Sequence, residues 1–80
     1  MSQLIPLELL QVGEEGSIHQ VEGCESLTHR LAEMGIREGA SIRMIRPGCP
    51  CLVAVNNHRM SLRIDGSASV LVEVLGRVTS

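Results

Sequence analysis

The chain has no phenylalanine, tyrosine or tryptophan among its 80 residues. Proteins that hold single-stranded nucleic acid usually stack the bases on aromatic rings, and modules that bind proline-rich peptides use aromatic-lined grooves. Neither mode of binding is open to this sequence. The net charge of −2 at neutral pH also argues against a general DNA-binding protein. We therefore expect no nucleic-acid partner.

Long apolar runs and a paired set of cysteines are also missing. No segment approaches the roughly 20 consecutive apolar residues that span a membrane, and the first residues lack the basic and then apolar pattern of a secretory signal peptide. Three cysteines are an odd number, which does not suit a disulfide framework. The sequence predicts a cytoplasmic protein with reduced thiols that meets a membrane only indirectly. Its length predicts a single domain over residues 1–80.

Lysine is the third absence, because all seven basic residues are arginine. Residues 1–25 contain five glutamates and no base, which gives −5, whereas residues 26–80 contain seven arginines against four acids, which gives +3. Exposed charges of this kind usually do no more than solvate a surface. The rigid guanidinium fork suits carboxylate or phosphate, so the asymmetry also allows a basic face that binds an acidic partner.

A short helix is predicted from apolar residues spaced at i, i+4 and i+7, on the face that we expect to meet the core: Leu27, Leu31 and Met34. Ser26 is the predicted N-cap. Gly35 suits the left-handed C′ position, where a side chain is unfavourable. In that geometry Ile36 folds back over Leu31, so the sequence predicts a helix stop that turns the chain over the core.

Alternating apolar residues predict five strands, at residues 17–21, 41–46, 51–55 and 59–63 and around the valines at 70, 72 and 74. Breakers separate them. Pro6 is the expected first residue of a short helical turn, Gly13 and Gly16 are expected to bracket a loop, and residues 65–69 are expected to form a turn. Asn56 and Asn57 predict a tight hairpin, since asparagine tolerates the positive φ that such turns need.

Five short strands and one helix, with no repeat and no linker, predict an all-β protein with one short helix, folded as a small closed barrel. Closure would remove the exposed edges of the sheet.

The order of these motifs resembles a known family. The segment RLAEMGIREGASIRMI, a Gly-Pro loop, a valine-rich strand, MSLR and SVLVEV follow one another over roughly residues 4–75, as in the FeoA family of ferrous-iron-transport accessory proteins. The resemblance implies an SH3-like β-barrel in the cytoplasm. It also implies an adaptor role toward the cytosolic, GTPase-bearing part of a FeoB-type ferrous iron transporter.

The residues themselves predict no enzyme. There is no G-x-x-x-x-G-K-[ST] motif for a nucleotide, and the three histidines are scattered: His19, His29 and His58. We expect no catalytic residue and no required cofactor.

One loop departs from the family pattern, because PGCPC stands where a Gly-Asp-Pro-like loop is common. Cys49 and Cys51 could share a soft cation such as Fe²⁺ or Zn²⁺, although a closed zinc site takes four ligands. The alternative hypothesis is therefore a transition-metal-binding or metal-sensing domain that uses these thiols. The simpler interpretation makes Cys51 a small apolar residue at the start of a strand and Cys49 a loop thiol.

Three arginines are the candidate partner-binding residues. In the strands at 41–46 and 59–63 the apolar residues face inward, so Arg43, Arg59 and Arg63 are expected to project outward. We expect them to contact an acidic surface of the transporter if their strands lie close together. The sequence does not establish that neighbourhood, nor an oligomeric state.

Overall fold

The computed structural model describes residues 2–63 and 68–75. This part of the chain forms, in order, β1 (Ser2–Pro6), the 3₁₀ helix η1 (Leu7–Leu9), β2 (Glu15–Gly23), α1 (Glu25–Glu33), β3 (Ser41–Arg46), β4 (Cys51–Val55), β5 (His58–Leu62) and β6 (Ala68–Leu75). Within these residues, neither helix is long and apolar enough to cross a membrane.

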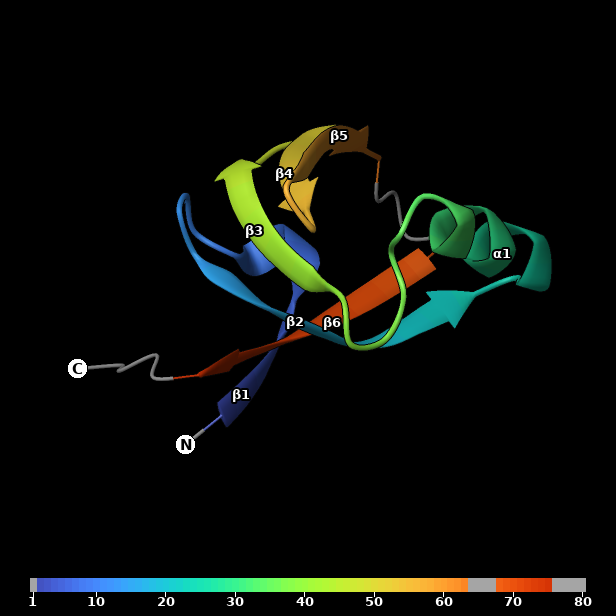
Figure 1. The fold of residues 1–80 in the computed structure, drawn as a ribbon, viewed down its shortest axis with the longest axis horizontal. Coiled ribbons are helices and arrows are strands. Elements are labelled where there is room, and N and C mark those ends of the chain that lie inside the picture. The colour runs from blue at the N-terminus through green and yellow to red at the C-terminus, as the bar shows by residue number, and fades with distance from the viewer. Residues whose placement is uncertain (1, 64–67, 76–80) are drawn as a thin grey trace.

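The strands form one antiparallel sheet in the order β1-β6-β2-β3-β4-β5 (Figure 1). The predicted class, all-β with one short helix, is confirmed. The sheet curls but does not close, so β1 and β5 are its two edges. Its sixth strand is β1, which sequence reasoning missed. Pro6 ends this strand and η1 begins one residue later, because the fixed φ of proline suits an extended residue as well as a first helical one.

Strand β2 holds the two halves of the sheet together. Residues 15–17 pair with β3, and residues 17–23 pair with β6. The prediction that Gly13 and Gly16 bracket a loop is therefore wrong for Gly16, which lies inside β2. A register shift between Ile18 and Gln20 adds one residue to the strand. This bulge explains why Ile18 and Val21 are out of phase in the sequence although both pack with the core.

At Gly16 the backbone of β2 comes unusually close to β6. A Cβ atom on this residue would collide with the carbonyl oxygen of Glu73 and would lie 2.8 Å from Cγ1 of Val72. Only glycine fits this approach, because the nearest obstacle is backbone that belongs to a central strand and cannot swing aside.

Helix α1 ends as the sequence predicts. Gly35 has φ +96°, its N–H donates to the Ala32 carbonyl at 3.0 Å, and the N–H of Ile36 donates to the Leu31 carbonyl at 2.9 Å. These two bonds define a Schellman motif. Ile36 is only 1% exposed, so the turn delivers this side chain into the core.

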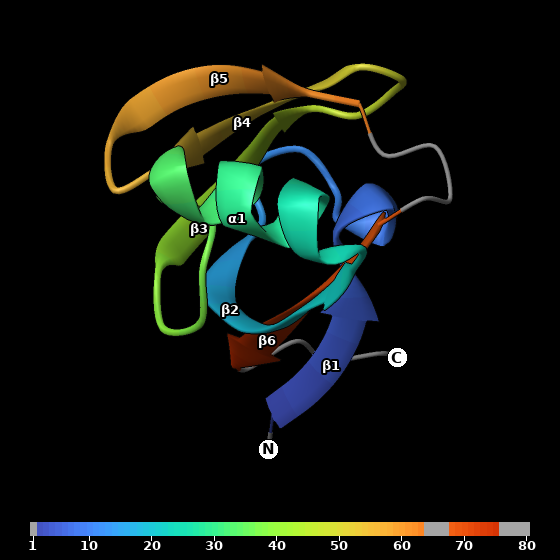
Figure 2. The same ribbon diagram turned by 90° about the vertical axis from the view of Figure 1, so that its right-hand side faces the viewer.

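The start of α1 and its buried face differ from the prediction. The N-cap is Cys24, and Ser26 lies inside the helix. No residue of α1 is buried: Leu31 is half-buried against the core, and Met34 is 39% exposed. In Figure 2, α1 lies between two parts of the curled sheet. One part consists of β4 and β5, and the other consists of β2, β6 and β1. A helix in that position touches the core with one edge only.

The core fills the inner face of the curled sheet with aliphatic side chains and a thiol. Its fully buried members share the alternation of their strands: Ile18, Ile42, Met44, Cys51, Val53, Val55, Val70 and Val72, with Leu7 and Ile36 from the connections. No polar or charged residue is buried in the described part of the chain. The polar residues of the strands therefore face outward.

The remaining turns follow their sequence signals closely. Asn56 and Asn57 have φ of 50° and 72°, which confirms the hairpin between β4 and β5. The bounds predicted for β3 and β4 are confirmed. Strand β5 is shifted by one residue, since it spans His58–Leu62 and the predicted range was 59–63. The turn predicted at residues 65–69 lies partly outside the described residues, and residues 68 and 69 already belong to β6.

We expect Gly16→Ala to lower the free energy of unfolding by about 1–3 kcal/mol, the usual cost of forcing extra volume into a packed site. The added methyl group would push β2 away from the carbonyl of Glu73. Urea denaturation measures the loss, and Ser17→Ala on the same strand, expected to change stability by no more than about 0.5 kcal/mol, is the control. Equal stability of Gly16→Ala and the parent would contradict the close approach.

Gly35→Val should lower the free energy of unfolding by about 1 kcal/mol or more, because a β-branched residue is poorly tolerated at positive φ. Space is not the cause, since a Cβ here would meet only Cγ1 of Val55, at an ordinary 3.7 Å. Gly35→Asn is the matched variant, because asparagine adopts the left-handed conformation more readily. Thermal denaturation should give the parent the highest melting temperature, Gly35→Asn an intermediate one and Gly35→Val the lowest.

Candidate partner-binding face

Two of the candidate arginines lie in one row across the sheet. Arg43 of β3 is registered with Ala54 of β4, and Ala54 is registered with Arg59 of β5. Residues directly opposite each other on antiparallel strands point to the same face. Arg43 and Arg59 are exposed, and they are two strand spacings apart, about 10 Å. The fold thus brings together two arginines that are 16 positions apart in sequence.

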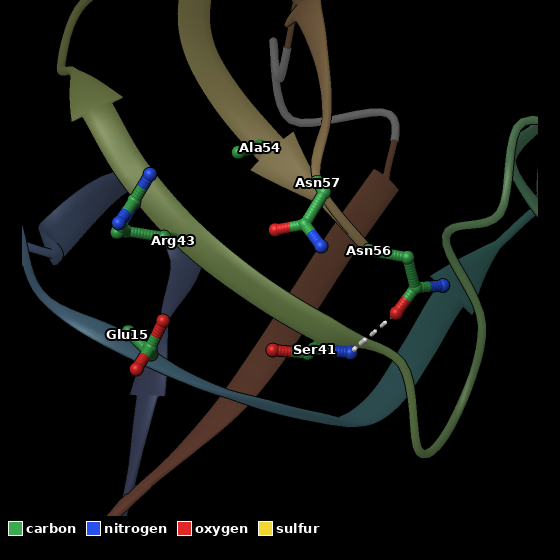
Figure 3. Close-up of a pocket in the computed structure, with 6 residues that line it drawn as sticks. All are labelled: Glu15, Ser41, Arg43, Ala54, Asn56 and Asn57. Atoms are coloured by element: carbon green, nitrogen blue, oxygen red, sulfur yellow. Dashed lines mark hydrogen bonds between the residues drawn. The ribbon is translucent and has the colours of Figure 1, made fainter.

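The side chain between the two arginines is small. Ala54 leaves open space on the outer face, and a shallow depression of about 260 Å³ lies there, lined by Glu15, Ser41, Arg43, Ala54, Asn56 and Asn57. Figure 3 shows Arg43, Ser41 and Asn57 around it, with Glu15 on the neighbouring strand. The Ser41 N–H donates to Oδ1 of Asn56 at 3.4 Å (Figure 3), which ties the hairpin to β3. The surface is polar and open to solvent.

Arg63 lies farther away than the other two. It is exposed and directly follows β5, four residues after Arg59, or about 13 Å along an extended chain. Sequence reasoning missed the polar residues that complete this face, Glu15, Ser41 and the two asparagines. The only signal for the asparagines was their turn propensity, and Glu15 carried no signal beyond its charge.

The two candidate metal-binding cysteines have different environments. Cys49 is exposed, whereas Cys51 is 2% exposed and begins β4. Burial raises the pKa of the Cys51 thiol, which disfavours the thiolate that a metal would need. Among residues 2–63 and 68–75 there is no group of three or more histidine, cysteine or acidic side chains that could hold a metal ion. The donor set therefore fits a closed zinc site poorly, and metal binding by these thiols stays a prediction.

The third cysteine, Cys24, could complete a metal site with Cys49 and Cys51 only if the fold brought it near them. Cys24 is exposed at the N-cap of α1, and its Sγ lies 3.5 Å from the hydroxyl oxygen of Ser26. Hydrogen bonds from the Ser26 hydroxyl and, to a lesser degree, from the Leu27 backbone lower the pKa of the Cys24 thiol. Of Cys24 and Cys51, Cys24 is therefore predicted to be the more reactive thiol.

Comparison with known proteins gives a consistent result. The family model of the FeoA domain matches residues 5–74. No curated protein matches the chain significantly. The crystal structure of an iron uptake regulatory protein (FeoA) superimposes with a TM-score of 0.78 at 20% identity, covering 90% of this chain and all of that one. The solution structure of the FeoA protein from Chlorobium tepidum superimposes with a TM-score of 0.79 at 24% identity, covering 90% of this chain and 71% of that one. At these identities the structural likeness concerns the fold.

We expect Cys51 to react with iodoacetamide at least about tenfold more slowly than Cys24 in the native protein, because it is shielded and its pKa is raised. Mass spectrometry of peptides after timed alkylation near pH 8 measures both rates. In urea the difference should disappear, which provides the control. Equal native rates would show that Cys51 does not lie in the core.

Proposed function

Because the chain belongs to the FeoA domain family, we propose that it acts in ferrous iron transport as a non-enzymatic adaptor in the cytoplasm. Its partner in this proposal is the cytosolic part of a FeoB-type ferrous iron transporter. The contact surface is the outer face of β3, β4 and β5, with Arg43 and Arg59 at its centre and Arg63 at its margin. The role is to bind and orient the transporter domain and involves no chemical step.

The observation that carries this proposal is the row Arg43–Ala54–Arg59. Two arginines on strands about 10 Å apart, with a small residue between them, leave room for an incoming acidic side chain. Arginine binds a carboxylate in a two-pronged geometry that lysine does not offer. An acidic surface on the transporter would complement this row.

The core supports a non-catalytic role. Catalytic acids, bases and nucleophiles are usually titratable groups held in clefts with strongly shifted pKa values. In the described residues the buried side chains are apolar, with the thiol of Cys51 as the one titratable member. The outer depression is open, and its polar side chains are those of a recognition surface.

The physics of such a surface predicts its kinetics. Arg43, Arg59 and Arg63 are exposed, and exposed charges mainly accelerate and orient association, with salt screening them beyond a Debye length of about 8–10 Å. Binding should therefore weaken as the ionic strength rises.

We expect Arg43→Glu combined with Arg59→Glu to weaken binding to the cytosolic domain of the cognate transporter at least about tenfold at low salt. Each change replaces an attraction with a repulsion. Adding Arg63→Glu should weaken binding further, by a smaller factor. Calorimetry at low and moderate salt measures the affinity, and circular dichroism checks the fold.

The matched control is Arg30→Glu combined with Arg37→Glu. Both residues are exposed, the net charge changes by the same amount, and neither lies on β3, β4 or β5. This pair should bind within about threefold of the parent, a difference of roughly 0.7 kcal/mol. If both double variants lose affinity equally, overall charge rather than the β3–β5 face controls binding. If neither loses affinity, the partner binds elsewhere.

A further inference from the structure

The charge on the outer face changes sign from one side of the sheet to the other. The row that contains Arg59, Ala54 and Arg43 continues onto β2 with Glu15, which is registered with Arg43. A second row runs Ser41, Ser17, Glu73 and Leu4 across β3, β2, β6 and β1. Arginines thus stand on the β3–β5 side of this face and glutamates on the β2–β6 side.

Two adjoining depressions connect these two sides. The first is the depression between Arg43 and the hairpin. The second, of about 440 Å³, is lined by Glu15, Gly16, Ser17, Ser41 and Glu73. They share Glu15 and Ser41, so they adjoin on the outer face, and together they are called the groove. Its floor is low because it contains glycine, serine and alanine, and its two ends carry opposite charges.

Glu73 is the notable residue at the acidic end. It is half-buried on β6, and its registered neighbours on β1 and β2 are Leu4 and Ser17, neither of which is charged. Glu15 differs, because it faces Arg43 directly across the β2–β3 pair. Strands β6 and β3 are separated only by β2, and Glu73 lies in the row of Ser41, two residues along β3 from Arg43. The backbone positions of Glu73 and Arg43 are therefore roughly 12 Å apart across the sheet.

We propose that this groove binds an extended segment of the partner that carries an acidic side chain for Arg43 and Arg59 and a basic side chain for Glu73. The inference rests on the proposed adaptor function and specifies the chemistry of the segment that docks. A separation of roughly 12 Å corresponds to about three to four residues of extended chain. The partner motif is therefore an acid and a base about three or four positions apart, laid across the strands over the small residues of the floor.

A uniformly acidic segment fits this groove less well. Its far end would meet Glu15 and Glu73, and like charges brought together at an interface oppose binding. Such repulsion is one means by which a surface rejects the wrong partner. The arginines attract the acidic end of the partner segment. The glutamates then favour a segment whose other end is basic, which fixes the direction in which it binds.

The decisive variant is Glu73→Gln, tested by calorimetry of the full chain against the transporter's cytosolic domain. The two-sign groove predicts that affinity falls about threefold to fivefold, as expected for the loss of one exposed charge pair. A purely basic face predicts the opposite, because removing a negative charge would strengthen the attraction to an acidic partner. Glu22→Gln is the control: it makes the same charge change on an exposed residue at the far end of β2, outside the groove, and should leave affinity unchanged.

The outcomes separate this inference from the proposed function. A loss with Glu73→Gln but not with Glu22→Gln supports the groove. Unchanged or tighter binding of Glu73→Gln, with a loss for the Arg43 and Arg59 double variant, overturns the groove and leaves the adaptor proposal standing. If neither the Arg43 and Arg59 double variant nor Glu73→Gln changes the affinity, both the groove and the adaptor proposal are overturned.

A second measurement does not depend on the transporter. The isotope-labelled full chain is titrated with two synthetic hexapeptides, acetyl-Glu-Glu-Gly-Ser-Arg-Arg-amide and acetyl-Glu-Glu-Gly-Ser-Glu-Glu-amide, and amide shifts are followed by NMR. The groove predicts that the mixed-charge peptide binds at least about three times more tightly than the acidic one. It should also change the amide chemical shifts of both Arg43 and Glu73. Equal or tighter binding of the acidic peptide, or shifts confined to the arginines, would overturn the inference.

Discussion

The structure depends on one close contact, the approach of β2 to β6 at Gly16. At this residue β2 has to pair with β3 on one side and come against the backbone of Glu73 on the other. A side chain of any size would force the two strands apart. The aliphatic core lies on the inner face of the curled sheet and includes Val72, which lies beside this contact, so separating the two strands would expose part of the core. In an 80-residue chain the stability that remains is small.

The same strand rearranges the charges. In the sequence, residues 1–25 contain five glutamates and no base, whereas residues 26–80 contain seven arginines and four acids, which suggests an acidic end and a basic end. In the fold β2 lies between β3 and β6, so Glu15 faces Arg43 and the acidic and basic residues share one face. Electrostatic recognition by this protein therefore depends on strand order, and neither the net charge nor the charge of a segment describes it.

The loop that departs from the family pattern illustrates how burial decides the chemistry of a residue. Cys49 and Cys51 are separated by a single proline and look like a pair in sequence. Strand β4 takes Cys51 into the core, where the thiol acts as a small apolar group with a raised pKa, and leaves Cys49 at the surface. Cys24, which has no cysteine near it in sequence, has the lowered pKa. Thiol reactivity follows environment rather than spacing.

The sequence by itself determined the features that depend on neighbouring residues. The stop at Gly35 with Ile36 folded back, the Asn56–Asn57 hairpin and the inward faces of β3 and β4 all follow from contacts within a few positions. Tertiary structure alone decided the remainder: β1 as a sixth strand, the shallow burial of α1 that leaves Met34 exposed, and the row that joins Arg43 to Arg59. The candidate arginines were thus identified one by one, but not as a face with Glu15 and Glu73. The physical reason is that strand pairing and close backbone approach join residues far apart in the chain, and their energies belong to the whole fold rather than to any local segment.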